Sequence, residues 1–379
     1  MTTSKILRYL IAGVWIANGL FCKVLHLVPR HEAIVARIIG DAHAGIVTMI
    51  IGCAEIAMAV WILSGIQPRL NALVQVAVIA TMNMLEFILA PDLLLWGKFN
   101  ALFAFLFILV ILYNEFYRDL RNHPFAVEAF FESSTVLTFA VPREQLQHLI
   151  PECLELDTFE DKWAFLAVAM VQTKDLRPKG FPRSFGNDFF LIGYRVFVRF
   201  TNQAGRHLRG LYILRSETDR KKMEFLGNMF THYHYSTTDI HQKLDKGCVE
   251  IRSDKSDFCI QVDNSGPGDS ANDDATADIP LPAGSPFADW KEARRFAGPL
   301  PFTFTYNPDD KEVLIIEGVR ENWKPAPVRV IEQHISFIER MKLADVRLAN
   351  AFIIRDIPYY WKKGKIEQWS PKEEVSRAY

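Results

Sequence analysis

The stretch AGIVTMIIGCAEIAMAVWIL, residues Ala44–Leu63, contains a single charged side chain, Glu55. An apolar run of about 20 residues is long enough to cross a bilayer as a helix. Three further stretches approach that length, at about 6–27, 70–89 and 97–116. The sequence therefore predicts an α-helical membrane bundle of four spans over residues 1–120.

Charged residues separate this part from the rest of the chain. Residues 1–117 hold only 7 Lys and Arg and 6 Asp and Glu, whereas the whole chain has 43 and 44. A membrane part, with the lipid bilayer as its partner, thus precedes a water-soluble part. The net charge of -1 gives no electrostatic reason to expect a nucleic acid partner.

Lys and Arg in short loops indicate the orientation of the spans. With the N-terminus inside, the cytoplasmic side holds five basic residues and the outer side four. These are Lys5, Arg8, Arg69, Arg118 and Arg121 inside, and Lys23, Arg30, Arg37 and Lys98 outside. The five cysteines form no C-x-x-C pair, which fits reduced thiols in a cytoplasm. We predict an integral protein of the bacterial inner membrane type with both termini cytoplasmic.

Polar residues within the spans are costly in hydrocarbon and usually face the interior of a bundle. The predicted cluster comprises Asn18, Lys23, Glu55, Asn83 and Glu86. In an up-down bundle, Lys23 and Glu86 lie at matching depth, so we expect them to pair. A buried ion pair that fixes helix register is favoured, and a ligand or quinone pocket is the alternative.

Residues 123–360 change to β patterning. The clearest hairpin joins strands at 189–201 and 206–215 through residues 202–205. The polar segment 264–283 is interpreted as a mobile loop and 361–379 as a C-terminal tail. Many strands with few short helices predict an α+β domain with an antiparallel, barrel-like sheet.

Candidate ligand-binding residues lie on this hairpin: Tyr194, Arg195, Arg199 and Arg209. Alternation places Arg195 and Arg199 on one strand face, and the turn brings Arg199 near Arg209. Facing arginines repel unless they are solvated, paired with an acid or bridged by an anion. A carboxylate ligand in a small cavity is therefore the functional interpretation, and a solvated surface is the alternative.

His232 and His234 form an H-x-H pattern, which on one strand face supplies half of a metal site. No third ligand follows at a recognisable spacing, so no metal is predicted and these two residues stay weak candidates.

The membrane part also resembles a known family. The run Val14-Trp15-Ile16-Ala17-Asn18-Gly19-Leu20-Phe21-Cys22-Lys23-Val24-Leu25, with Gly52 to Glu55 and Thr81 to Phe87, is similar to the DoxX-like four-helix membrane proteins. Some relatives are membrane subunits of quinone-linked sulfur oxidation. The resemblance thus implies a redox setting with quinone as the cofactor alternative, although the residues themselves predict no cofactor.

The soluble part resembles the uncharacterised domain family that shares the acetoacetate-decarboxylase-like fold. The carriers are Leu149-Ile150-Pro151, Leu156-Asp157-Thr158-Phe159, Leu176-Arg177-Pro178-Lys179-Gly180-Phe181-Pro182 and Gly193-Tyr194-Arg195-Val196-Phe197-Val198. Acetoacetate decarboxylase uses a Schiff-base lysine beside a second lysine, but here Arg183 follows Gly180-Phe181-Pro182. The decarboxylase lysine is not evident.

The sequence therefore favours an integral membrane protein whose cytosolic β-rich domain binds a small organic ligand, an acid. The alternatives are a membrane-anchored enzyme acting on a small keto or hydroxy acid, and a quinone-linked redox subunit. The sequence also leaves open whether the protein has a partner in a membrane complex or forms a homo-oligomer.

Overall fold

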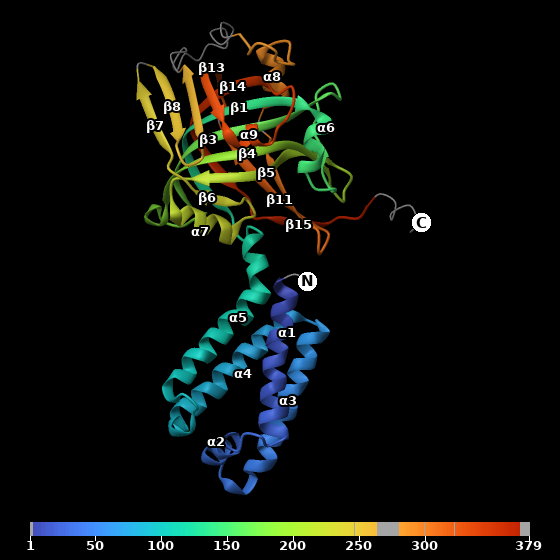
Figure 1. The fold of residues 1–379 in the computed structure, drawn as a ribbon, viewed down its shortest axis with the longest axis vertical. Coiled ribbons are helices and arrows are strands. Elements are labelled where there is room, and N and C mark those ends of the chain that lie inside the picture. The colour runs from blue at the N-terminus through green and yellow to red at the C-terminus, as the bar shows by residue number, and fades with distance from the viewer. Residues whose placement is uncertain (1–2, 246, 264–279, 299, 322, 372–379) are drawn as a thin grey trace. The chain divides into compact units, whose positions relative to one another are not determined.

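The computed structural model describes residues 3–245, 247–263, 280–298, 300–321 and 323–371. The chain divides into two units, Met1–Asp119 and Leu120–Tyr379. Figure 1 shows the first as helices and the second as a curved sheet with short helices. The predicted mobile loop at 264–283 falls outside the described residues up to residue 279.

Helices α1 to α5 build the first unit. They span α1 Thr3–Ile16, α2 Arg30–Ile39, α3 Ala44–Ser64, α4 Pro68–Leu89 and α5 Asn100–Arg121, and a π-helical segment, Ala17–Val24, continues α1. Among the described residues, four segments are long and apolar enough to span a membrane: Ile6–Val24, Asp41–Ser64, Pro68–Leu89 and Gly97–Tyr117. Outward-facing Ile46 and Val60 are 66% and 63% exposed, as expected of a lipid-covered surface. The protein is an integral membrane protein.

Two glycines bring the first span against α3. A Cβ on Gly19 would lie 2.7 Å from the carbonyl oxygen of Gly52, and a Cβ on Gly52 would lie 2.8 Å from that of Gly19. Small residues allow membrane helices to approach this closely. This contact fixes which residues of α3 face the π-helical segment.

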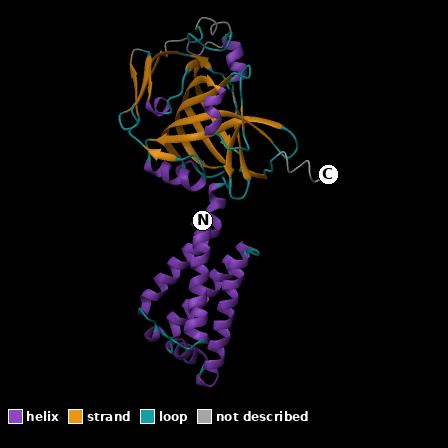
Figure 2. Cartoon of the chain, turned by 45° about the vertical axis from the view of Figure 1, so that its right-hand side comes forward, coloured by secondary structure: helices purple, strands orange, loops and turns teal. Residues whose placement is uncertain are grey.

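The second unit is built on a closed ring of strands. Ring neighbours follow the order β14-β1-β3-β4-β5-β10-β11, and β11 pairs again with β14. The ring strands are β1 Val127–Pro142, β3 Trp163–Pro178, β4 Asn187–Thr201, β5 His207–Thr218, β10 Phe302–Asn307, β11 Glu312–Arg320 and β14 Arg347–Trp361. All ring pairs are antiparallel except β5 with β10. The predicted antiparallel, barrel-like α+β domain is confirmed (Figure 2).

A second sheet covers one outer face of the barrel. It runs in the order β13-β9-β8-β7. Its strands are β7 His241–Asp245, β8 Cys248–Ser253, β9 Phe258–Asp263 and β13 Arg329–Ile335; the remaining elements are β2 Glu155–Leu156, β6 Tyr235–Thr237, β12 Ala326–Pro327, β15 Lys365–Gln368, α6 Arg143–Leu146, α7 Lys221–Phe230, α8 Trp290–Phe296 and α9 Ser336–Arg340. Leu166 and Val168 of β3 share a buried cluster with Ile251 and Ile260 of this sheet.

Alternate residues of the ring strands face the lumen, because side chains alternate along a strand. At one end of the barrel the lumen is filled by Phe165, Phe197 and Phe287 together with Ala293 of α8. Helix α7 lies at the other end (Figure 1). We call Phe165, Phe197 and Phe287 the aromatic plug, which closes one end of the lumen. A cavity occupies the other end.

The predicted C-terminal tail is wrong for its first part. Strand β14 runs to Trp361, and Lys365–Gln368 forms β15, which pairs with β11. Glu367 is buried and accepts a hydrogen bond from the backbone nitrogen of Gln203 at 3.0 Å, while Trp369 packs edge-on against Tyr306. These contacts order a polar segment that looks like a tail in the sequence; residues 372–379 lie outside the described part.

Candidate functional site

The open end of the barrel holds a cavity of about 470 Å³. Its walls come from all seven ring strands, and α7 covers it with Met223, Leu226 and Phe230. Most of the lining is apolar, with Phe131, Phe189, Leu191, Ile213, Ile354 and Ile357 among its residues. A mostly apolar cavity with a few converging polar groups is the usual form of a small-molecule site.

Arg195 of β4 is the central polar group of the cavity. Protein surrounds it, and the part of its surface that stays accessible lines the cavity. Its guanidinium lies over Gly193, where a Cβ would come within 3.1 Å of Nε and Nη2. Burial lowers the pKa of Arg195, and its Nε has no hydrogen-bond partner. A guanidinium stays protonated in proteins, so this is an enclosed, partly accessible cation without an acid beside it.

Arg320, at the end of β11, is a second cation of the same cavity. Its guanidinium carbon lies 4.2 Å from the ring centre of Trp323 and 5.7 Å from that of Tyr359, and its Nη2 has no hydrogen-bond partner. Burial lowers its pKa, and the charge of Arg195 lowers it further. The absent side chain of Gly318 leaves room for the hydroxyl of Tyr359. The effect of Arg195 on the pKa of Arg320 shows that the two guanidinium groups lie within electrostatic range of each other.

Three tyrosines complete this polar group. Tyr233, Tyr235 and Tyr359 line the cavity, and each interacts electrostatically with Arg195. Burial raises the pKa of Tyr233 above its usual range and that of Tyr235 to about 12, so both stay phenols at neutral pH. We call Arg195, Arg320, Tyr233, Tyr235 and Tyr359 the arginine–tyrosine cluster. Its guanidinium and phenol groups all donate hydrogen bonds.

The cavity lining has no balancing carboxylate. None of the described residues that line it is Asp or Glu. A third arginine of the lining, Arg177, is neutralised by Glu128, whose Oε1 lies 2.7 Å from Nη2. The cationic charge of Arg195 and Arg320 is thus uncompensated by the surrounding side chains.

A β-bulge explains why the nearest acid of β5 is absent from the lumen. Tyr194 pairs with Arg215 but Arg195 pairs with Ile213, so Leu214 is an extra residue in β5. Before the bulge, the odd-numbered residues Leu211 and Ile213 line the cavity. After it, the even-numbered Ser216 lines the cavity and the odd-numbered residues point away from it. Glu217 therefore lies on the outer face.

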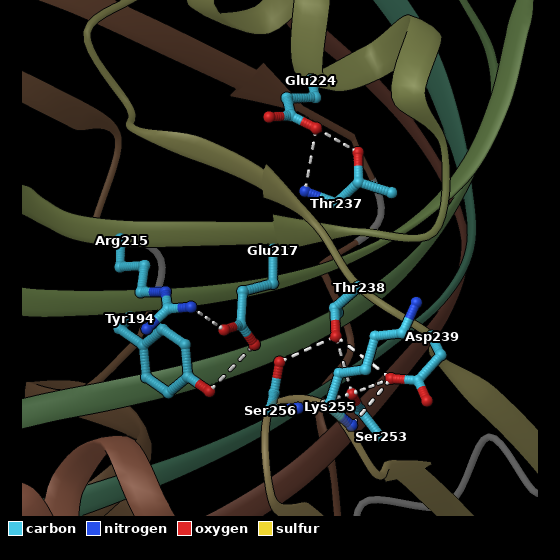
Figure 3. Close-up of polar contacts among 10 residues, drawn as sticks. All are labelled: Tyr194, Arg215, Glu217, Glu224, Thr237, Thr238, Asp239, Ser253, Lys255 and Ser256. Carbon is cyan, nitrogen blue, oxygen red and sulfur yellow. Dashed lines mark hydrogen bonds and ion pairs between the residues drawn. The ribbon is translucent and has the colours of Figure 1, made fainter.

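Figure 3 shows the Glu217 carboxylate between the side chains of Arg215 and Tyr194. Glu217 is buried with its Oε1 2.7 Å from Nη2 of Arg215, and its Oε2 accepts a hydrogen bond from the Tyr194 hydroxyl at 3.4 Å. Tyr194 also packs against Phe337 of α9. Tyr194, a predicted ligand-binding residue, thus belongs to the outer core, because it alternates with Arg195 along β4.

Arg199 and Arg209 are adjacent in the β4–β5 register, as the hairpin predicts. They are bridged by the buried carboxylate of Asp157, with Oδ1 3.3 Å from Nε of Arg199 and Oδ2 2.7 Å from Nε of Arg209. Arg209 also donates to the carbonyl of Phe296. The anion between these arginines is a side chain of the protein, and neither arginine lines the cavity that contains Arg195.

Helix α7 is fixed over the cavity by polar contacts with the segment that follows it. Glu224 accepts hydrogen bonds from both the backbone nitrogen and the hydroxyl of Thr237 (Figure 3). Asn228 accepts from the nitrogen of Tyr235 at 2.9 Å, and Gly227 has no side chain where the Tyr235 ring lies. The lid of the cavity and one residue of the cluster are therefore positioned together.

The histidine pair does not form a strand face. His232 and His234 precede β6, His234 is exposed with φ of 53°, and His232 bonds to Asn122 at 3.2 Å. Burial, together with Arg121, lowers the pKa of His232 to about 4. The expected alternation fails because this segment is a turn and not a strand.

In the membrane bundle, Lys23 pairs with Glu55 and not, as expected, with Glu86. The Nζ of Lys23 lies 2.7 Å from both carboxylate oxygens of Glu55. The Gly19–Gly52 contact brings these two residues together, because Lys23 and Glu55 follow the glycines by four and three residues. Asn18 donates to the carbonyl of Val14, and Asn83 donates to that of Ile79 and accepts from Asn100.

Sequence analysis missed Arg320 and the three tyrosines of the cluster. The candidate residues predicted for the barrel domain came from the hairpin at 189–215 and the following segment, and none was sought on the strand that contains Gly318. Continuing the alternation by two residues would have put Arg320 on the face of Gly318. The convergence of the tyrosines carries no local signal, since they come from the segment after α7 and from β14.

Comparison with known proteins supports both resemblances seen in the sequence. Residues 12–113 match the DoxX-like family. Residues 129–351 match DUF2071, described as an uncharacterised conserved protein. No curated protein matches the chain.

Solved structures with some similarity include an acetoacetate decarboxylase, an acetoacetate decarboxylase-like enzyme and a biosynthetic enzyme. One from Legionella pneumophila, an acetoacetate decarboxylase, is 12% identical, with 64% of this chain and 87% of that chain covered and a TM-score of 0.41. An acetoacetate decarboxylase-like enzyme from Sphingomonas wittichii is 11% identical, with coverage of 66% and 94% and a TM-score of 0.40. The enduracididine biosynthesis enzyme MppR, complexed with pyruvate, is 11% identical, with coverage of 64% and 90% and a TM-score of 0.36.

The DUF2071 match covers more than half of the chain, and the second unit, which contains the cavity, lies largely within it. The protein therefore belongs to the DUF2071 family and carries a DoxX-like membrane segment ahead of that domain.

Proposed function

We propose that the barrel domain binds a small organic acid in its lumen, with the carboxylate on Arg195 and Arg320. The observation that carries this proposal is the pair of enclosed arginines with unpartnered guanidinium nitrogens in a cavity whose described lining has no acid. Buried charges are normally paired, because an unpaired one costs several kcal/mol even after relaxation. A bound carboxylate supplies the missing partner.

The hydrogen-bonding groups of the cluster also select the chemistry of the ligand. Guanidinium groups bind carboxylates through parallel, charge-assisted bonds, and phenols donate one further bond each. A cation or a metal ion would be repelled by the same groups. Lys222 is the only lysine among the described lining residues, and it is exposed on α7. The lumen therefore favours binding of an acid over imine chemistry on it.

The direct test compares benzoate with benzyl alcohol, which share a ring and differ in charge. The full chain in lipid nanodiscs should be stabilised against thermal unfolding by benzoate and not by the alcohol, since only ligands of the native state shift its stability. Arg195→Gln or Arg320→Gln should weaken benzoate binding by about 10- to 100-fold, the equivalent of a charged hydrogen bond of about 1.5–3 kcal/mol.

Arg199→Gln is the matched control, because Arg199 lies on the same strand but forms an ion pair with Asp157 outside the cavity. It should leave benzoate binding within about twofold of wild type. Equal stabilisation by benzyl alcohol, or equal losses for the Arg195 and Arg199 variants, would contradict the proposal.

The unpaired arginines should also make the ligand-free wild-type domain less stable than a variant in which Arg195 is replaced by an apolar residue. Replacing Arg195 by Met removes an enclosed charge and its repulsion from Arg320, so the free protein should gain about 1–3 kcal/mol. The same variant should lose stabilisation by benzoate. A substitution that lowers stability both with and without benzoate would show that Arg195 is a structural residue.

The orientation of the chain forms part of the proposal. Five basic residues against four, together with the free cysteines, support cytoplasmic termini. A C-terminal alkaline phosphatase fusion should be inactive in a bacterial host, and a green fluorescent protein fusion at the same position should fluoresce. An active phosphatase fusion would reverse the orientation.

A further inference from the structure

Along strand β4, the lining of the cavity changes from apolar at Phe189 and Leu191 to charged at Arg195. Strand β4 runs through it with Asn187, Phe189, Leu191 and Arg195 all in the lining. At about 3.3 Å per residue, Asn187 and Arg195 lie roughly 26 Å apart along this strand. The two residues between them that line the cavity, Phe189 and Leu191, are apolar.

Arg195 marks the inner end of this gradient. It stands next to the aromatic plug, because Phe197, two residues further along the same face of β4, belongs to that plug. Its guanidinium lies over Gly193, on the side of Arg195 that leads toward Leu191.

Exposed aromatic residues mark the outer end. Phe181 and Phe185, in the connection between β3 and β4, both line the cavity and are 52% and 59% exposed. Their rings meet edge to face, with centroids 5.8 Å apart. A ligand whose charge lies on Arg195 therefore passes Leu191 and Phe189 before it reaches solvent.

The volume limits the size of that ligand. A water molecule occupies roughly 30 Å³ of liquid, and a carbon or oxygen atom with its hydrogens takes similar space. A cavity of about 470 Å³ thus holds on the order of 15 non-hydrogen atoms. A two- or three-carbon acid would leave most of the apolar wall uncovered.

We propose that the ligand is an amphiphilic monocarboxylic acid with an apolar tail of about ten to twelve carbons, which lies along Leu191 and Phe189 toward the mouth. This inference rests on the proposed function for the position of the carboxylate, and it adds the chemistry of the tail. The tail of the ligand then covers the apolar wall, and its carboxylate neutralises the arginines.

The experiment is equilibrium dialysis of straight-chain acids from butyrate to hexadecanoate against the full chain in nanodiscs, with empty nanodiscs as the blank for lipid partition. Affinity should rise about fourfold for each added methylene, as expected for burial of apolar surface. It should level off near about twelve carbons, when the tail fills the cavity. Primary alcohols of the same lengths serve as uncharged controls.

Two neighbouring phenylalanines supply a matched pair of variants. Phe189 and Phe190 are both 4% exposed, but Phe189 lines the cavity and Phe190 belongs to the outer core. Phe189→Leu should weaken dodecanoate at least threefold and leave butyrate unchanged. Phe190→Leu, which removes the same atoms at the same burial, should alter neither.

The outcomes separate this inference from the proposed function. Acids that bind with affinity independent of chain length would overturn the tail and leave the carboxylate site standing. Alcohols that bind as well as the acids would overturn the carboxylate site itself. Equal effects of Phe189→Leu and Phe190→Leu on dodecanoate would also overturn the tail, because both would then act through the fold.

Discussion

Separating Lys23 from Glu55 should destabilise the membrane bundle far more than removing both. The two charges make two contacts of 2.7 Å and their side chains are only 6% and 7% exposed. Either Lys23→Met or Glu55→Leu leaves the other charge buried without its partner. The double variant replaces an ion pair by apolar side chains of similar volume.

The expected magnitudes follow from that geometry. Removing one member of a buried pair costs about 3–5 kcal/mol, whereas replacing both by apolar residues is often neutral or stabilising. The free energy of unfolding of the double variant should therefore exceed that of either single variant by about 3 kcal/mol or more. Glu86→Gln should cost less than about 1 kcal/mol, because Lys23 directs its hydrogen bonds to Glu55.

The assay is reversible unfolding in mixed micelles by titration with a denaturing detergent, followed by the circular dichroism of the helices. Arg69 and Asp119 provide the exposed control, with Nη2 and Oδ2 2.9 Å apart and side chains 67% and 41% exposed. Breaking that pair should cost only about 0.2–1 kcal/mol. Additive losses for Lys23→Met and Glu55→Leu in the double variant would refute the reasoning, since independent residues add.

Two other perturbations test the second unit. Gly193→Ala places a Cβ 3.1 Å from Nε and Nη2 of Arg195, so benzoate binding should fall by about tenfold or more while thermal unfolding of the free protein changes little; unaltered binding would show that the guanidinium does not lie over Gly193. The pKa of His334 is raised because its Nε2 bonds to Asp257 at 3.0 Å and because Glu339 lies 3.0 Å from Nδ1. The stability that protonated His334 contributes is fully present below the unfolded histidine pKa of about 6.5 and is lost as pH rises through the higher folded value. His334→Gln should therefore unfold at a lower temperature than wild type at about pH 5.5 and at the same temperature at pH 9; a constant difference at both pH values would contradict this.

The sequence by itself determined the two-part architecture. Four apolar runs and a change to alternating β patterns are local signals, because the length of a span and the period of a strand are set by nearby residues. The β4–β5 register also followed from its short turn, so the adjacency of Arg199 and Arg209 was predictable. The same local reasoning could not say that Asp157, from another part of the chain, would occupy the space between them.

The partners of the buried charges were decided by the tertiary structure. Depth in an ideal bundle matched Lys23 with Glu86, but close approach at two glycines and a π-helical turn aligned it with Glu55 instead. In the barrel, one extra residue in β5 moved Glu217 to the outer face and left Arg195 without an acid. Alternation is a local rule, and a single bulge reverses it for every residue that follows. The position of Glu217 outside the lumen follows from that reversal, which only the paired strands reveal.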